Sequence, residues 1–161
     1  SFSFMRREFA KVMVDLATND QKIILIILDV GGNTFDEFKK KFPQRFFNLG
    51  VSEQASVSFA SGLALEGFKP YIYTIAPFLL ERPFEQIKLD IVQQNANVKL
   101  FGYWDYPTAG PTHKPLNVVK SCEILGINLI EPKNSIMLRE SMIESYFKNK
   151  PCFFYLIKNP E

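Results

Sequence analysis

The sequence predicts an α/β protein with three layers, in which helices cover both faces of a mainly parallel sheet. Apolar runs of strand length alternate along the 161 residues with segments whose apolar residues recur at helical spacing. The clearest run, residues 23–28, contains only isoleucine and leucine, and continuous apolar strands are typical of parallel sheets covered on both faces. We therefore expect right-handed crossovers within one domain that spans residues 1–161.

Each element is predicted from its local pattern. Residues 6–19 have apolar side chains at helical spacing, which predicts a helix that ends at the turn Asn19-Asp20. The glycine pair Gly31-Gly32 closes the first apolar run, so a strand should end before it. The predicted strands are residues 22–30, 69–74, 98–103, 128–130 and 152–157. The further predicted helices are residues 35–42, 52–66, 82–94, 116–125 and 135–149.

Composition and charge argue against several classes of protein. Hydrophobic residues make up 47% of the chain, which is enough for a core without metals or disulfides. The net charge is +2 and no basic stripe of a nucleic-acid-binding domain is present. Cys122 and Cys152 form no Cys-x-x-Cys pair, so we expect reduced thiols and a cytoplasmic location. No run reaches the length of a membrane span, no signal peptide is expected, and the single His113 cannot build a multi-histidine metal site.

Glu53 is the first candidate for chemistry, because it lies where a short apolar run meets a helical segment. In open α/β sheets, ligands bind outside the carboxyl ends of the strands, where loops and helix starts converge. Ser52 could cap this helix by accepting a hydrogen bond from a backbone N–H, which would leave Glu53 in the first turn near the positive end of the helix dipole. An acidic residue stabilises a helix start without any ligand, so the position alone leaves both roles open.

Common catalytic motifs do not account for this segment. Residues 50–54 match only the first half of the Gly-x-Ser-x-Gly turn of serine hydrolases, since Gln54 replaces the second glycine. The sequence contains neither the phosphate-binding loop of nucleotide triphosphatases nor the Gly-x-Gly-x-x-Gly motif of dinucleotide-binding domains.

Five segments, taken together and in order, resemble the pyrimidine-binding domain of transketolases and of deoxyxylulose-5-phosphate synthase. They are Phe-Phe-Asn-Leu-Gly-Val-Ser-Glu-Gln at 46–54, Phe-Ala-Ser-Gly-Leu-Ala at 59–64, Gly-Phe-Lys-Pro-Tyr at 67–71, residues 78–87 with the ending Arg-Pro-Phe-Glu-Gln-Ile, and Gly-Pro-Thr-His-Lys-Pro at 110–115. The resemblance spans nearly the whole chain and implies the fold of thiamine-diphosphate-binding pyrimidine domains.

The resemblance implies a specific role for Glu53. It corresponds to the family's glutamate that hydrogen-bonds N1′ of the aminopyrimidine of thiamine diphosphate. A carboxyl group that burial keeps partly protonated can share a proton with that nitrogen. This favours the imino form at the 4′ position, whose nitrogen removes the C2 proton of the thiazolium and so generates the ylid.

Three further residues have an implied role and a plainer alternative. Phe78 corresponds to the aromatic ring that lies against the pyrimidine, although filling the core is equally compatible with the sequence. His113 corresponds to the histidine that touches the substrate near the reacting carbon, or it is a loop histidine bonded to the backbone. Arg82 could reach an anionic group of the substrate, or it begins its helix as a solvated residue.

The sequence also departs from the family pattern. Ala109 stands where the family usually has an aspartate that reads a sugar hydroxyl, and residues 103–108 lack the family's additional histidine. The Gly-Asp-Gly motif, through which a separate domain of these enzymes binds the diphosphate and Mg²⁺, does not occur here. We therefore expect the diphosphate-binding domain and the C-terminal domain to be absent from this chain and the first to come from a partner.

The resulting expectation is the pyrimidine-binding subunit or domain of a thiamine-diphosphate-dependent transketolase-like enzyme. It would transfer a two-carbon ketol unit between sugar-phosphate-like substrates, in a homo- or hetero-oligomer, only in complex with a diphosphate-binding chain or domain that also binds Mg²⁺. An alternative of another class is a non-catalytic assembly subunit that retains the fold and the dimer interface. Ala109 favours this alternative, whereas Glu53 and His113 oppose it. A flavodoxin-like nucleotide-binding domain is a third alternative, which rests on fold class alone.

Overall fold

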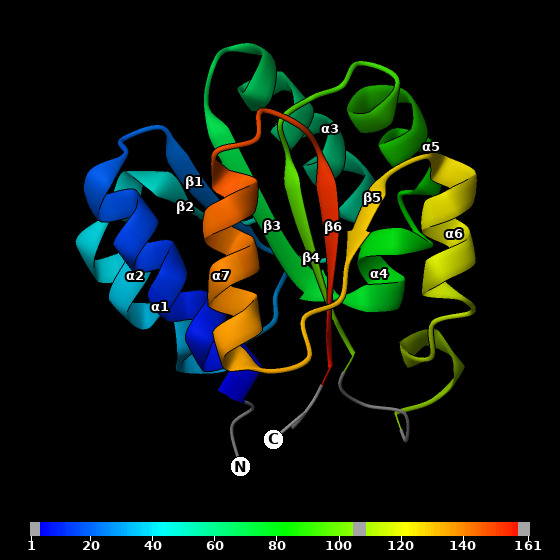
Figure 1. Ribbon diagram of the computed structural model, residues 1–161, viewed down its shortest axis with the longest axis horizontal. Coiled ribbons are helices and arrows are strands. Elements are labelled where there is room, and N and C mark those ends of the chain that lie inside the picture. Colours follow the sequence, from blue (N-terminus) through cyan, green and yellow to red (C-terminus); the bar gives the residue numbers. More distant parts are fainter. Residues whose placement is uncertain (1–3, 105–108, 158–161) are drawn as a thin grey trace.

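A parallel sheet of six strands forms the middle layer of the computed structural model, which describes residues 4–104 and 109–157 (Figure 1). The strand order is β2-β1-β3-β4-β6-β5. Every neighbouring pair runs parallel, which confirms the predicted α/β architecture. The strands are β1 (Ile23–Ile27), β2 (Phe46–Asn48), β3 (Lys69–Ile75), β4 (Lys99–Trp104), β5 (Asn128–Ile130) and β6 (Cys152–Ile157).

Helices cover both faces of this sheet (Figure 1). The first face carries α1 (Phe4–Asn19), α2 (Asp36–Lys41) and α7 (Ser135–Tyr146). The second face carries α3 (Glu53–Leu65), α4 (Ala76–Leu80), α5 (Phe84–Gln86), the π-helix η3 (Ile87–Val92) and α6 (Val118–Leu125). Short 3₁₀ turns are η1 (Gly32–Phe35), η2 (Pro43–Arg45) and η4 (Pro111–His113).

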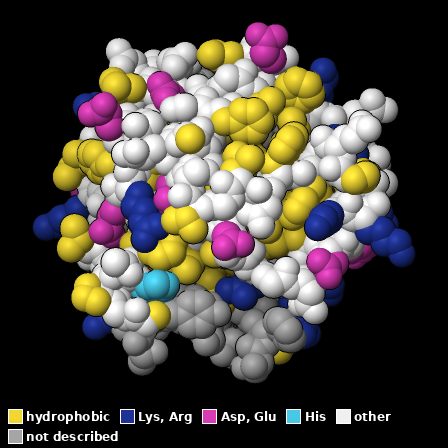
Figure 2. Space-filling model, turned by 180° about the vertical axis from the view of Figure 1, so that it is seen from behind, with side chains coloured by type: hydrophobic (Ala, Val, Ile, Leu, Met, Phe, Trp, Pro, Cys, Tyr) yellow, Lys and Arg dark blue, Asp and Glu magenta, His cyan; other side chains and the backbone are white. Residues whose placement is uncertain are grey.

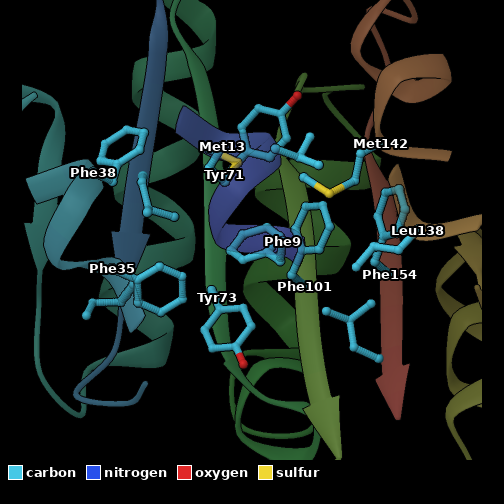
Figure 3. Packing of buried hydrophobic residues seen from close by; sticks show 14 of the residues in the cluster. Phe9, Met13, Phe35, Phe38, Tyr71, Tyr73, Phe101, Leu138, Met142 and Phe154 are labelled. Carbon is cyan, nitrogen blue, oxygen red and sulfur yellow. The ribbon is translucent and has the colours of Figure 1, made fainter. Parts of the chain in front are cut away.

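The two faces of the sheet have different cores. Successive strand residues point to opposite faces, and the first face collects most of the buried aromatic rings (Figure 3). Phe9 of α1 lies 4.5 Å from Phe101, and Phe101 stacks on Phe154 of the neighbouring strand at 4.4 Å between ring centroids. The second face is mainly aliphatic, with buried side chains that include Ile24, Ile26, Val57, Ile72, Leu79 and Leu100.

Three features differ from the sequence prediction. The edge strand β2 was not predicted, because three residues are too short for an apolar run to stand out. The helix α4 was not predicted either, since it follows β3 directly and contains Pro77 in its first turn. Residues 82–94 were expected to form one α-helix, but α5 begins at Phe84 and passes into the π-helix η3. Apolar spacing does not separate a π-helix from an α-helix, because both bury one face.

The chain changes direction across the sheet between β1 and β3. The connection from β1 leads to β2, whereas the connection from β3 leads to β4 on the other side. Such a switch point leaves a crevice at the carboxyl ends of the strands, where ligands bind in open α/β sheets. The start of α3, with Glu53, lies at this edge, directly after β2.

Candidate active site

The junction between β2 and α3 is held by backbone groups and one amide side chain. Asn48 Oδ1 accepts hydrogen bonds from the backbone N–H of Asp29 at 2.9 Å and of Gly50 at 3.1 Å. Gly50 has a φ of 69°, in the left-handed region that favours glycine, and a Cβ would meet nothing within 4 Å. The backbone conformation, not the available space, therefore calls for glycine here. This turn leads the chain into α3, whose first residue is Glu53.

The structure corrects one detail of this junction. Ser52 occupies the N-cap position of α3, but its side chain makes no capping hydrogen bond. Its hydroxyl instead donates to the carbonyl oxygen of Leu49 at 2.7 Å and lies 3.1 Å from Ser56 Oγ. The predicted capping bond is wrong because the hydroxyl is turned back toward the loop. Glu53 remains in the first turn, next to the positive end of the helix dipole.

Glu53 is almost fully buried, with 6% of its surface exposed. Its Oε1 accepts a hydrogen bond from Arg82 Nη1 at 3.0 Å. Within residues 4–104 and 109–157, the other oxygen, Oε2, has no hydrogen-bond partner. A buried carboxylate requires donors to offset its desolvation, so a ligand with a ring N–H could complete its set of partners. A pocket of about 450 Å³ beside it is lined by Val51, Ser52, Glu53, Gln54, Ala55 and Arg82.

Phe78 and His113, the predicted aromatic and histidine residues, are connected to Glu53 by contacts that run through Arg82. The Cζ atom of Arg82 lies 3.7 Å from the centroid of the Phe78 ring. Phe78 in turn meets His113 edge to face, with 4.9 Å between the ring centroids. Glu53, Arg82, Phe78 and His113 thus form one continuous series of contacts, although they come from α3, the turn between α4 and α5, α4 and η4. Their functional roles stay predictions, but the fold brings all four together.

Two polar residues that the sequence did not point to hold this arrangement. Gln54 Nε2 donates to the backbone carbonyl oxygen of Arg82 at 3.4 Å. Glu81 Oε2 accepts from the backbone N–H of Leu116 at 3.1 Å, which ties the end of α4 to the segment after His113. Both partners are distant in sequence, so no local pattern could have indicated them.

The remaining predicted features lie at the edge of the site or outside it. His113 Nδ1 lies 3.1 Å from the hydroxyl of Thr112. Ala109 is exposed, and residues 105–108 of the preceding loop lie outside the described residues. Across the two described stretches, no group of three or more histidine, cysteine, aspartate or glutamate side chains is placed to hold a metal ion. No helix in those stretches is long and apolar enough to cross a membrane.

A parallel sheet with a buried carboxylate at a helix start, linked through an arginine to an aromatic ring, is the arrangement of an α/β domain with a candidate ligand site at the carboxyl edge of the sheet. The family model for the pyrimidine binding domain of transketolase matches residues 4–159. The chain therefore belongs to the transketolase pyrimidine-binding domain family, whose enzymes use thiamine diphosphate, and the resemblance inferred from the five segments is confirmed.

Relatives and solved structures agree with this assignment. The chain is 30% identical over 140 residues to one subunit of the apulose-4-phosphate transketolase of Phocaeicola vulgatus, a match that covers 84% of this chain and 45% of that protein. It is 32% identical over 152 residues to 1-deoxy-D-xylulose-5-phosphate synthase of Aquifex aeolicus, covering 89% and 23%. A solved split-gene transketolase, an inactive β4 tetramer, superposes with a TM-score of 0.86 at 27% identity, covering 96% of this chain and 51% of that one. The chain thus spans about half or less of each protein's length.

Proposed function

We propose that this chain supplies the pyrimidine-binding half of a thiamine-diphosphate-dependent enzyme that transfers a two-carbon ketol unit between sugar-type substrates. One observation carries the proposal: the carboxylate of Glu53 is buried at the carboxyl edge of the sheet, and its Oε2 has no partner among the described residues. Membership of the transketolase family and the transketolase names of the relatives support the reaction type.

The residues at this edge fit the aminopyrimidine of thiamine diphosphate. Recognition of its N1′ needs a carboxyl group, which Glu53 provides, and recognition of its ring needs a flat apolar surface, which Phe78 provides. When bound, the cofactor supplies a nucleophilic thiazolium carbon that adds to carbonyl groups. We infer that Glu53 holds a proton between Oε2 and N1′. Burial strengthens this hydrogen bond, because few water molecules compete for the carboxylate.

His113 would act on the substrate rather than on the cofactor. Its imidazole lies against Phe78, on η4. A histidine can donate a hydrogen bond from one ring nitrogen and accept one at the other. We infer that it orients a hydroxyl or carbonyl oxygen of the sugar-type substrate and exchanges a proton with that oxygen.

A partner chain or domain should complete the site. The sequence has no Gly-Asp-Gly motif for the diphosphate and Mg²⁺. The transketolase relative from Phocaeicola vulgatus is named as one subunit of its enzyme, and in the split-gene transketolase a tetramer of β chains is inactive. These names support a partner subunit. We infer that this partner binds the diphosphate and Mg²⁺ and closes over Glu53.

The outer surface of α3 is the surface that we propose for this partner. Phe59 and Leu65 of this helix are 40% and 63% exposed, and Val51, just before the helix, is 70% exposed. Figure 2 shows the face of the molecule that carries α3, where hydrophobic side chains lie exposed among polar ones. Because Glu53 begins the same helix, a domain that docks here also reaches the open side of the site.

Reconstitution tests the proposal. The full-length protein is combined with its diphosphate-binding partner, thiamine diphosphate and Mg²⁺, and ketol transfer is measured with a panel of sugar phosphates. We expect turnover with the wild-type chain and a decrease of about 10² to 10⁴ in kcat for Glu53→Gln. The matched control Glu66→Gln changes an exposed carboxylate at the other end of α3 and should keep full turnover. Absence of turnover with every substrate, or full turnover of Glu53→Gln, would contradict the proposal.

A further inference from the structure

We propose that the Arg82 side chain occupies the pyrimidine subsite of the unliganded protein, and that the cofactor must displace it to bind. This inference rests on the proposed function, because it takes Glu53 and Phe78 as the groups that bind the aminopyrimidine. In this role Arg82 is neither a substrate-binding residue nor a simple solvated residue. Arg82 is an internal occupant of the site.

The two contacts of the guanidinium group are those that the aminopyrimidine would make. Arg82 donates to the buried carboxylate of Glu53 at 3.0 Å, and its Cζ lies 3.7 Å from the centre of the Phe78 ring. A guanidinium is planar and carries N–H donors in its plane. An aminopyrimidine protonated at N1′ is also planar and also carries an in-plane N–H donor. The guanidinium therefore imitates the shape and the hydrogen bonding of the ligand.

We infer that the guanidinium lies where the pyrimidine would bind. Arg82 bridges Glu53 and Phe78, so a ring that stacks on the same face of Phe78 and also bonds Glu53 would take the place of the guanidinium. The other ring contact of Phe78 among the described residues is with His113, which has no hydrogen bond or ion pair with Glu53 there. Stacking on the His113 side would thus leave the pyrimidine without its carboxylate.

Arg82 can leave this position without a rearrangement of the backbone. Its side chain is 37% exposed, and the pocket of about 450 Å³ lies beside it. The main chain at Arg82 is fixed independently of its side chain. Gln54 donates a hydrogen bond to the carbonyl oxygen of Arg82, and the preceding residue, Glu81, accepts one from the backbone N–H of Leu116. Rotation about the side-chain bonds of Arg82 is then sufficient to uncover Glu53 and Phe78.

This arrangement stabilises the protein before the cofactor binds and weakens cofactor binding. An unpaired buried carboxylate is costly, and the bond from Arg82 to Oε1 offsets part of this cost, while Oε2 has no partner among the described residues. An ion pair in which the arginine is 37% exposed, together with one cation–π contact, stabilises the closed form only modestly. If the open form makes up about a tenth of the molecules, the apparent Kd for the cofactor is raised about tenfold.

Removal of the guanidinium should tighten cofactor binding and destabilise the unliganded protein, and these two opposite effects test the inference. In the full-length protein with its partner, Arg82→Met keeps the aliphatic part of the side chain and removes the guanidinium. We expect the Kd of thiamine diphosphate, measured by titration calorimetry at fixed Mg²⁺, to decrease about tenfold, while the Tm of the unliganded protein decreases. Lys88→Met, a change at an exposed lysine of η3, should alter neither quantity. An unchanged or higher Kd in Arg82→Met would overturn the inference, because a purely structural or ligand-contacting arginine predicts that result.

Two additional measurements separate this inference from the proposed function. Arg82→Lys keeps the charge and the fold but loses the planar group, and it should tighten binding by a smaller factor than Arg82→Met; looser binding in this variant also counts against the inference. A thiamine diphosphate analogue with CH in place of N1′ tests the site itself. If this analogue binds the wild-type protein as tightly as the cofactor does, the assignment of Glu53 fails. If the analogue binds weakly but Arg82→Met does not tighten cofactor binding, only the displacement of Arg82 is wrong.

Discussion

The ligands proposed for His113 and Glu53 differ: the first residue would contact the sugar-type substrate and the second the cofactor. It is partly buried on η4 and packs against Phe78, whereas Glu53 lies at the start of α3. A side chain that contacts the substrate affects kcat/KM, but the Kd of a cofactor bound elsewhere need not change. The division of roles between these two residues can therefore be measured.

For His113→Asn, we expect kcat/KM for the sugar-type substrate to decrease by about 10² or more, with the Kd of thiamine diphosphate nearly unchanged. Steady-state kinetics of the reconstituted enzyme and calorimetric titration of the cofactor give the two quantities. The exposed neighbour Lys114→Gln serves as the control. An unchanged kcat/KM would show that His113 is a loop residue without a substrate contact.

At the scale of elements, α4 is placed by a close approach to β4. A Cβ on Gly102 of β4 would lie 2.6 Å from Cζ of Phe153 and 3.0 Å from Cα of Ala76, the first residue of α4. Glycine therefore allows this helix to pack directly on the strand. Since α4 carries Phe78, the same approach positions the ring of the candidate site.

Gly102→Ala should lower the free energy of unfolding by about 1–3 kcal/mol, because the added methyl group overpacks the interface between α4 and β4. Urea unfolding checks this value. Gly62→Ala is the matched control: Gly62 lies inside α3, where an added Cβ would meet nothing within 4 Å, and alanine should stabilise a helix interior by about 0.5–1 kcal/mol. Equal stability of Gly102→Ala and wild type would refute the close approach.

A second link between elements involves a carboxylate. Asp20, just after α1, accepts hydrogen bonds from Lys69 Nζ at the start of β3 and from the hydroxyl of Tyr146 at the end of α7, both at 2.7 Å. Burial raises the pKa of Asp20, but these bonds and one from the backbone N–H of Lys22 outweigh it and lower the pKa to about 2. The network thus joins three elements at the edge of the sheet opposite the candidate site.

This pKa predicts how stability depends on pH. The unfolded chain takes up the proton near the ordinary value of 3.8, and the folded chain takes it up only near 2. The stabilisation is therefore fully present above about pH 4 and is lost as the pH falls toward about 2. A shift of this size corresponds to about 2 kcal/mol.

Asp20→Asn should lower the unfolding free energy at neutral pH by about 1–2 kcal/mol and flatten its decrease between about pH 4 and pH 2. Chemical unfolding at a series of pH values measures both effects. The exposed Glu123→Gln on α6 is the control and should retain the wild-type profile. If Asp20→Asn kept the wild-type decrease, other carboxylates would have to cause it.

For the molecule as a whole, the proposed partner surface on α3 makes a prediction about assembly. Phe59→Gln should weaken association with the diphosphate-binding partner by about tenfold or more, because a central aromatic residue commonly contributes above 1 kcal/mol to an interface. Ile136→Gln on α7 replaces a more exposed apolar residue on the opposite face and should associate normally. Analytical ultracentrifugation of each variant with the partner measures association. Equal weakening by both variants would exclude a specific role for α3.

The sequence predicts the whole architecture better than its details. Continuous apolar runs and helical spacing identify five of the six described strands and the layer order, because buried parallel strands and amphipathic helices follow strict patterns. The strand β2, the helix α4 and the π-helix η3 depend on tertiary contacts, which cannot be read from the local spacing of apolar residues. The same holds for the site: Glu53 stands out at a helix start, but its bond to Arg82 crosses 29 positions of sequence.

We propose that Glu53 activates the cofactor through N1′, and the rate at which the cofactor's C2 proton exchanges with solvent measures this activation. The measurement needs no knowledge of the sugar substrate. The reconstituted enzyme with thiamine diphosphate is diluted into D₂O, quenched with acid at short times and analysed by proton NMR. We predict that Glu53→Gln slows the exchange by about 10² or more relative to the wild-type enzyme, while Glu66→Gln exchanges at the wild-type rate. Equal exchange rates in Glu53→Gln and the wild-type enzyme, with the cofactor bound to both, would contradict the claim.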